Sequence, residues 1–364
     1  MFPRNPAKPP GCRPGIIFLC LGLLTLSACE SEVEPVSGQS FGAGIFIVNE
    51  GPFQSGSGTL SFHDRQTKEV RHMVYSQANG GASIGNIFQS MSIQGGKVYL
   101  VANNAGRMLV ASNTTLRHLG MLDGLAQPRF CLPVSEDKAC ITQWGSDGNS
   151  GSLLLVDLTT FTVQDTIQTG VGPEQMLRMG NRLYVTNSGG IGGVDSTVTV
   201  IDIDRWQVTD QLVVGTNPVS LAATPDGAVW IGCAGYFDWA DPGNPLNEAG
   251  RLVRLVEDKV DRTIPLSTGA HDLTSTGDGK RLLFLGTNYG SSVYQFSLEN
   301  NQETVGTFLS GNYYALAVDP MTGHILVSDA MDFQSVGRVH IFDPAGQEQG
   351  AFDAGVIPGG FAFQ

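Results

Sequence analysis

The stretch "RLYVTNSGG", residues 182–190, decides the fold because it is one copy of a pattern that recurs along the chain. Leu183, Tyr184 and Val185 suit a buried strand, and the Ser-Gly-Gly that follows Asn187 suits a turn. Six other segments place an apolar strand before a polar or glycine-rich stop. The residues at the Tyr184 position in these segments are Phe46, Tyr99, Cys140, Trp230, Phe284 and Leu326. Successive copies are 41 to 54 residues apart, a period typical of β-propellers.

Each copy contains strand-like segments that we call A to D in chain order, with the repeated stretch as segment B. One complete example has "PEQMLRMG" (173–180) as A, "STVTVIDI" (196–203) as C and "RWQVTDQLVV" (205–214) as D. The first copy lacks segment A, and the chain ends in "IPGGFAFQ" (357–364), which resembles a segment A with no B after it. We therefore predict an all-β fold, a seven-bladed β-propeller of four-stranded antiparallel blades over residues 44–364. The C-terminal strand would close the ring as the inner strand of the first blade.

The N-terminal region is predicted to be a targeting segment. Residues 1–28 begin with basic side chains and contain an apolar core, "IIFLCLGLLTL" (16–26), that is too short to span a bilayer as a helix. The sequence "LSAC" (26–29) resembles the lipobox of bacterial lipoproteins. That resemblance implies cleavage before Cys29 and lipidation of its sulfur. An ordinary signal peptide, cut at a small residue nearby, is the alternative.

Residues 29–43 are predicted to form an acidic, flexible tether. Glu30 and Glu32 resemble a signal that, in one group of Gram-negative bacteria, directs lipoproteins to the outer face of the outer membrane. A solvated linker without a targeting role is the alternative. The expected location is the outer membrane, with attachment through the lipid anchor only and the propeller facing the cell exterior.

Charge and cysteine content limit the possible partners. Residues 1–28 contain three basic residues and no acidic one, so the remaining chain has 18 Lys and Arg against 34 Asp and Glu, a net charge of −16. Such a chain lacks the basic surface that binds nucleic acid. Cys131, Cys140 and Cys233 are the cysteines that remain after Cys29. They are too few for a disulfide framework, and we expect buried free thiols.

The blade at residues 171–227 closely resembles the consensus of the YVTN β-propeller family. The opening "FIVNEGPFQSGSGTLSFHDRQT" (46–67) resembles a narrower set of secreted, seven-bladed lipoproteins that are often associated with outer-membrane TonB-dependent receptors. Some of these capture vitamin B12 at the cell surface. The resemblance implies a nutrient-binding protein that passes its ligand to a TonB-dependent transporter. A corrinoid such as vitamin B12 is one candidate ligand, beside another macrocycle, a glycan or a peptide.

The expected topology places the B–C and D–A connections on one face of the propeller, which we call the top face. The B–C loops there are long and aromatic, whereas the A–B and C–D turns of the opposite face are short. The starts of the A segments add a ring of polar and aromatic side chains nearer the axis. The predicted ligand-binding residues are Arg129, Trp144, Glu174, Tyr236, Phe237, Trp239, His271, Tyr289 and Tyr313. The alternative is a water-filled channel that binds nothing.

Sequence motifs of catalysis are missing from the chain, which has no Gly-x-Ser-x-Gly elbow, no His-Glu-x-x-His and no phosphate loop. The loops "SDGNSG" (146–151) and "DWADPGN" (238–244) lack the ligand spacing of a known calcium loop, and we interpret both as turns. We expect a protein that is not an enzyme, with no catalytic residue, cofactor or metal. A propeller enzyme of the lactonase or dehydrogenase type, or a structural or protein-binding propeller, remains the alternative.

Overall fold

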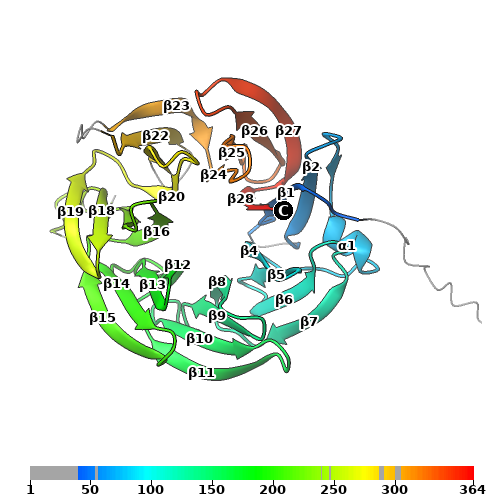
Figure 1. Ribbon diagram of the computed structural model, residues 1–364, viewed down its shortest axis with the longest axis horizontal. Helices are drawn as coiled ribbons and strands as arrows, with labels where there is room; N and C mark the ends of the chain where they lie inside the picture. Colours follow the sequence, from blue (N-terminus) through cyan, green and yellow to red (C-terminus); the bar gives the residue numbers. More distant parts are fainter. Residues whose placement is uncertain (1–39, 54–55, 239, 246, 287–290, 300–304) are drawn as a thin grey trace, which may run out of the picture. The chain divides into compact units, whose positions relative to one another are not determined.

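The computed structural model describes residues 40–364, apart from 54–55, 239, 246, 287–290 and 300–304. Seven four-stranded antiparallel sheets surround a central axis as the blades of a propeller (Figure 1). The predicted all-β fold with seven blades is therefore confirmed. The signal segment, Cys29, Trp239 and Tyr289 lie outside the described residues.

Each blade runs from an inner strand A at the channel to an outer strand D. Blade 1 contains β28 (Pro358–Phe363), β1 (Gly44–Asn49), β2 (Thr59–Asp64) and β3 (Val70–Arg71) and is followed by α1 (Val74–Ala78). Blade 2 contains β4 (Phe88–Gln94), β5 (Lys97–Ala102), β6 (Arg107–Ser112) and β7 (His118–Asp123). Blade 3 contains β8 (Pro128–Pro133), β9 (Lys138–Gln143), β10 (Ser152–Asp157) and β11 (Thr162–Gln168).

The other four blades follow in the same order. Blade 4 contains β12 (Pro173–Met179), β13 (Arg182–Asn187), β14 (Thr197–Asp202) and β15 (Gln207–Val213). Blade 5 contains β16 (Pro218–Ala223), β17 (Val229–Cys233), β18 (Arg251–Val256) and β19 (Lys259–Pro265). Blade 6 contains β20 (His271–Ser275), β21 (Arg281–Leu285), β22 (Ser291–Ser297) and β23 (Val305–Tyr313). Blade 7 contains β24 (Ala315–Val318), β25 (Ile325–Asp329), β26 (Val336–Phe342) and β27 (Glu348–Val356).

The two ends of the propeller close the ring as predicted. The C-terminal strand β28 pairs with β1 in antiparallel register, with Phe363 opposite Ile45 and Pro358 opposite Asn49. On the face opposite the top face, the ion pair between Arg65 and Asp319 joins blade 1 to blade 7. The Asp319 side chain is only 3% exposed. Closure removes the unpaired inner edge that β1 would otherwise present.

The core consists of layers between neighbouring blades. Tyr184 of β13 packs in one buried cluster with Val229, Ile231 and Val253 of blade 5. Strands B are apolar on both faces because one face contacts the preceding blade and the other contacts the next. The free cysteines Cys131, Cys140 and Cys233 are buried in this core, as expected.

One repeat position differs from the sequence-based alignment. Phe284 packs with Trp230 on the side of blade 5, whereas Leu283 packs with Leu316 of blade 7 and is the true counterpart of Tyr184. In the A–B turn of blade 6, the N–H of Thr276 donates a hydrogen bond to the carbonyl of Arg281. This turn is one residue longer than the equivalent turn of blade 5. A shift of one residue moves a strand side chain to the other face of the sheet.

In the part of the chain that the structure describes, no helix has the length and apolar character needed to cross a membrane.

Candidate functional site at the central channel

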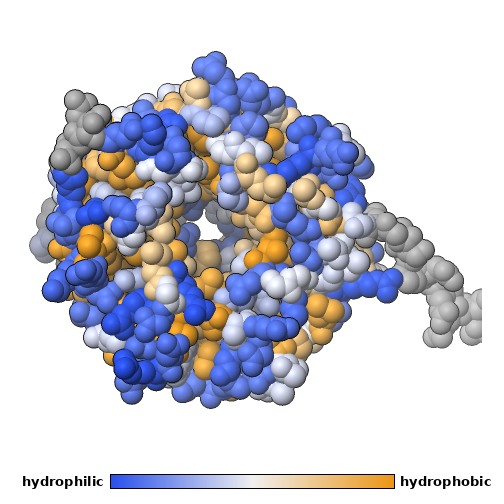
Figure 2. All heavy atoms as spheres, viewed as in Figure 1, coloured by the Kyte–Doolittle hydropathy of each residue, from blue (hydrophilic) through white to orange (hydrophobic). Residues whose placement is uncertain are grey.

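The inner strands surround a cavity of about 390 Å³ on the propeller axis. Figure 2 shows the hollow at the centre of the ring. The polar side chains that line it are Glu50, Gln89, Ser90, Arg129, Glu174, Gln175, His271, Asp272 and Tyr314. Glu50 directly follows a strand B, and Arg129 and Glu174 stand at the starts of strands A, so these side chains belong to the top-face end of the channel.

The backbone at the start of the inner strands aims side chains into the channel. Pro128 and Pro173 begin β8 and β12, and the residues before them, Gln127 and Gly172, have positive φ angles of 55° and 63°. The proline ring restricts φ and leaves no N–H to pair. The residues that follow the two prolines are Arg129 and Glu174, and both line the cavity.

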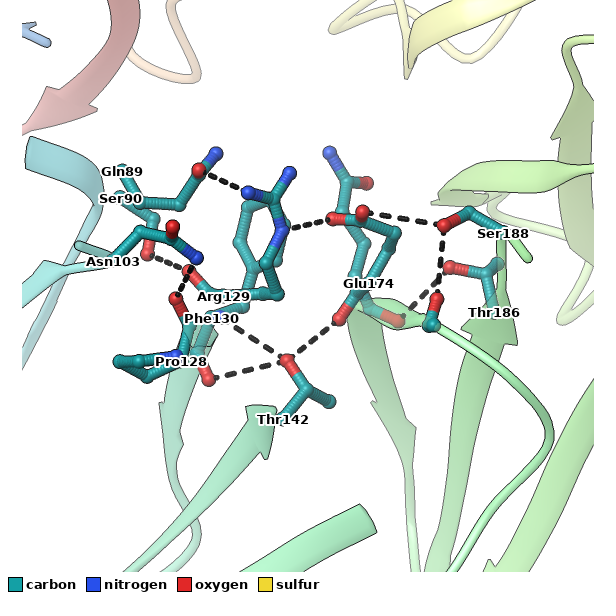
Figure 3. Close-up of polar contacts among 12 residues, drawn as sticks. Gln89, Ser90, Asn103, Pro128, Arg129, Phe130, Thr142, Glu174, Thr186 and Ser188 are labelled. Carbon is teal, nitrogen blue, oxygen red and sulfur yellow. Dashed lines mark hydrogen bonds and ion pairs between the residues drawn. The ribbon is translucent and has the colours of Figure 1, made fainter. Parts of the chain in front are cut away.

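Arg129 and Glu174 form a charged pair across blades 3 and 4 (Figure 3). Nε of Arg129 donates to Oε2 of Glu174 at 3.0 Å, and Nη1 donates to Oε1 of Gln89 in blade 2. The guanidinium also lies over the Trp144 ring, 4.2 Å from its centroid, a distance that allows a cation–π interaction. Burial raises the pKa of Glu174, and the charge of Arg129 opposes that shift. The positive charge of Arg129 and the negative charge of Glu174 therefore largely neutralise each other.

A second polar group lies across blades 1, 6 and 7. The hydroxyl of Tyr314 donates to the Glu50 carboxylate, with O–O distances of 3.2 and 3.3 Å. The pKa of Glu50 is raised to about 7, mainly by burial and also by the charge of Asp272, while Arg129 and the hydrogen bond from Tyr314 oppose the increase. Burial also raises the pKa of Asp272 to about 6. The N–H of Leu316, which donates to this carboxylate at 3.1 Å, opposes the increase. Carboxylates perturbed in this way are typical of functional sites.

The predicted site residues fall into three groups. Arg129, Glu174 and His271 line the cavity, and Trp144 lies against Arg129. Tyr236 is half-buried in the β17–β18 loop, where its backbone pairs with Glu248, and Phe237 beside it is 47% exposed at the top face. Trp239 and Tyr289 are outside the described residues.

Tyr313 does not line the cavity. Its ring lies 6.3 Å from that of His340, near the outer strands of blade 7, and the adjacent Tyr314 takes the channel position. The error is one residue in register, because the sequence alignment assigned the first tyrosine of the pair to the start of strand A. The last residue of β23 is Tyr313 itself.

Sequence reasoning also missed Gln89 and Glu50 as site residues. The alignment of the repeats placed Ile87 at the Arg129 position, but Ile87 has a positive φ of 52°, like Gln127, so it corresponds to Gln127 and Gln89 corresponds to Arg129. That shift could have been found by aligning Phe88 with the prolines. No pattern in the sequence marked Glu50, because it reaches the channel from a loop after strand B.

The top face carries large exposed apolar side chains around this channel. Phe53 is 66% exposed. Others in the B–C loops of blades 4, 5 and 7 are Ile191, Phe237, Met331 and Phe333. Among the described A–B and C–D turns of the opposite face, Met321 is the one large apolar side chain with high exposure. Of the two faces, the top face therefore carries more of these side chains, while others, such as Leu119, Met121 and Val163, lie on the outer strands.

The two aspartate-containing loops form turns in the described residues. Oδ1 of Asp147 accepts the N–H groups of Asn149 and Ser150, and Oδ1 of Asp238 accepts the N–H groups of Ala240 and Asp241. Within the described ranges, no three His, Cys, Asp or Glu residues are grouped so that they could hold a metal ion.

The chain belongs to a protein family described as a domain of unknown function (DUF5074), whose profile matches residues 43–350. Comparison with curated proteins found no match. A quinonprotein alcohol dehydrogenase-like protein from Bacteroides thetaiotaomicron VPI-5482 is similar in structure, with 14% identity, a TM-score of 0.68 and coverage of 89% of this chain and 79% of that chain. The periplasmic gluconolactonase PpgL from Pseudomonas aeruginosa has 14% identity, a TM-score of 0.63 and coverage of 88% and 99%. Apo AztD from Citrobacter koseri has 10% identity, a TM-score of 0.53 and coverage of 88% and 97%. Such low identities indicate a shared propeller fold alone.

Proposed function

We propose that this DUF5074 protein is an outer-membrane lipoprotein, anchored through Cys29, that binds a nutrient ligand on its top face and passes it to a TonB-dependent transporter. The observation that carries the proposal is the arrangement of the top face. Exposed apolar side chains such as Phe53 and Phe237 stand on loops around a channel whose mouth is polar and charged. Binding sites combine apolar area with a few directional polar groups in this way.

The geometry favours a ligand that is broader than the channel. A cavity of about 390 Å³ holds only part of a large molecule, so the remainder would spread over the apolar loop tips. A corrinoid meets both requirements, because it is a large macrocycle with polar groups at its edge. This ligand class is our proposal, and it draws on the resemblance of residues 46–67 to the propellers that capture vitamin B12.

The binding proposal is tested by calorimetric titration of the purified full chain with cyanocobalamin. We expect heat at micromolar concentrations, and Phe237→Ala should weaken binding by about 1 kcal/mol or more, as loss of an aromatic anchor does. Met321→Ala, on the opposite face, is the control and should leave the affinity unchanged. Absence of heat at micromolar concentrations would reject the corrinoid, and equal loss in both variants would reject the top face as the site.

A lactonase-type enzyme is the second candidate, and one observation favours it. Glu50 has a pKa near 7, the range in which a carboxylate serves as a general base at neutral pH. Proton release from a sugar lactone, measured with the wild type and Glu50→Gln, tests this candidate. Hydrolysis by the wild type that Glu50→Gln abolishes would establish an enzyme, and we expect no such difference.

A further inference from the structure

The charges at the channel mouth do not balance. Three carboxylates line the cavity, from Glu50, Glu174 and Asp272, and Arg129 is the one Lys or Arg side chain among the described lining residues. Arg129 donates to Glu174 and to Gln89, so its charge is largely matched by Glu174. In the described lining, neither Glu50 nor Asp272 forms an ion pair with a lysine or arginine, although the charge of Arg129 also acts on Glu50 and His271 lines the same cavity. The mouth therefore has an excess of negative charge whenever these two groups are ionised.

The hydrogen bonds leave acceptor capacity at Glu50. Within the described part of the chain, its carboxylate receives one hydrogen-bond donor, the hydroxyl of Tyr314, whose single proton is shared between two oxygens. An ionised carboxylate has about four lone-pair sites and no proton to donate. A ligand group that approaches Glu50 in its ionised form must therefore donate a hydrogen bond.

The inner strand of blade 1 makes room for this carboxylate. Gly359 of β28 lies directly against the Glu50 side chain, and a Cβ atom at that position would collide with Oε1. Both Gly359 and Gly360 line the cavity beside Glu50. Because position 359 carries no side chain, the Glu50 carboxylate has room to lie against the backbone of β28 at the cavity wall.

We propose that Glu50 is the specificity-determining residue of the channel mouth. Its carboxylate accepts hydrogen bonds from an N–H donor of the ligand, a primary amide or an ammonium group, and it disfavours a carboxylate or phosphate at the same place. The proposal rests on the channel mouth being the ligand site, as in the proposed function. The primary amides at the edge of a corrinoid would be such donors, and a free alkylammonium group would be another source of the same chemistry.

Protonation supplies a signature for this role. The charged and titratable groups that share the cavity with Glu50 are Arg129 of β8, Glu174 of β12, His271 and Asp272 of β20, and Tyr314 next to β24. Burial is the largest cause of the raised pKa of Glu50, which is about 7. An ammonium group binds the ionised carboxylate, so its affinity should fall as the pH decreases below that value. The limit is about tenfold per pH unit for each proton taken up.

The experiment uses three matched probes with the purified full chain: butylammonium, butyramide and butyrate. Affinities are measured by ligand-observed NMR at millimolar concentrations, the range that ligands of a few non-hydrogen atoms require. At about pH 8 we expect butylammonium to bind more tightly than butyramide, and butyrate to bind least, because charge-assisted hydrogen bonds are the stronger ones. Glu50→Gln should weaken butylammonium binding about tenfold or more and remove the part of its pH dependence that is centred near pH 7, while Asp272, with a pKa of about 6, keeps its own contribution.

Glu299→Gln is the matched control, because Glu299 is an exposed carboxylate that pairs with Lys280 on the opposite face. It should bind all three probes like the wild type. Equal affinities for butylammonium and butyrate, unchanged ammonium binding in Glu50→Gln, or no butylammonium binding at millimolar concentrations would each overturn the proposal.

A cyanocobalamin titration separates this inference from the proposed function. If cyanocobalamin binds the wild type and Glu50→Gln equally, the inference fails and the proposed function stands. If butylammonium selectivity is present but cyanocobalamin does not bind, the inference stands and the corrinoid is rejected.

Discussion

Replacing Glu50 with glutamine should stabilise the protein at alkaline pH and have little effect in acid. Folding raises the pKa of this carboxyl from 4.5 to about 7 because the side chain loses contact with water. A raised pKa means that the folded state favours the protonated form. Glu50 therefore causes no loss of unfolding free energy below about pH 4.5, where it is protonated in both states. The loss develops as the pH rises through about 7.

The size of the effect follows from the same shift. Each pKa unit corresponds to about 1.4 kcal/mol, so the increase from 4.5 to about 7 amounts to roughly 3 kcal/mol of lost unfolding free energy at about pH 8. Glutamine is neutral at every pH and keeps an oxygen that can accept the Tyr314 hydroxyl. Glu50→Gln should recover about 2–3 kcal/mol at that pH.

Urea unfolding of both proteins, followed by tryptophan fluorescence and circular dichroism, measures the difference. We expect coincident transitions, no difference in unfolding free energy at about pH 4, and the full gain at about pH 8. Glu299→Gln serves as the control, and an exposed pair of this kind contributes about 1 kcal/mol at most.

Two results would refute the reasoning. Destabilisation of Glu50→Gln at alkaline pH would mean that the ionised carboxylate has a favourable partner. A gain that is the same at both pH values would mean that the effect does not come from ionisation. A double-mutant cycle adds a further check: because Asp272 raises the pKa of Glu50, the gain from Glu50→Gln should be smaller in an Asp272→Asn background.

Three other predictions concern closure and anchoring. Deletion of residues 357–364 removes β28 and should cost most of the stability, and a truncated chain that melts like the full-length protein would contradict ring closure. Asp319→Ala leaves Arg65 without its partner and should cost about 3–5 kcal/mol in thermal unfolding, whereas loss of the exposed pair of Arg338 should cost about 1 kcal/mol or less. Cys29→Ala should release a soluble or uncleaved form, detected by membrane fractionation, and continued tight membrane association would argue against lipidation.

The architecture could be predicted from the sequence because packing repeats. Every strand B must be apolar on both faces to lie between two blades. The pattern that contains Tyr184 in one blade and Trp230 in the next therefore recurs along the chain at a similar number of residues. The closure could be predicted too, since the incomplete first repeat and the unpaired segment at 357–364 complement each other, and the structure pairs them. Local turn lengths were harder to predict, because the one-residue insertion before Leu283 changes which side chain faces the next blade.

The candidate site was only partly predictable because it is formed by residues distant in sequence. Arg129 and Glu174 were found, since both follow a proline at the start of strand A. Glu50 was not found, because the Tyr314 hydroxyl that contacts it is 264 positions away in the chain. Repeat reasoning aligns equivalent positions of the blades, and it does not reveal contacts between non-equivalent positions.

The chemistry of the channel mouth is itself an argument for function. The seven starts of strand A have the same backbone role, so packing alone would allow similar small or apolar residues at each. Instead, residues as different as Gln89, Arg129 and Glu174 occupy equivalent positions in blades 2, 3 and 4. A buried carboxylate such as Glu50 that forms no ion pair lowers the free energy of unfolding at neutral and higher pH, and a neutral side chain of the same shape would avoid that loss. Natural proteins retain such destabilising groups where they serve binding or catalysis, so the channel mouth is the place where the function of this propeller should be sought.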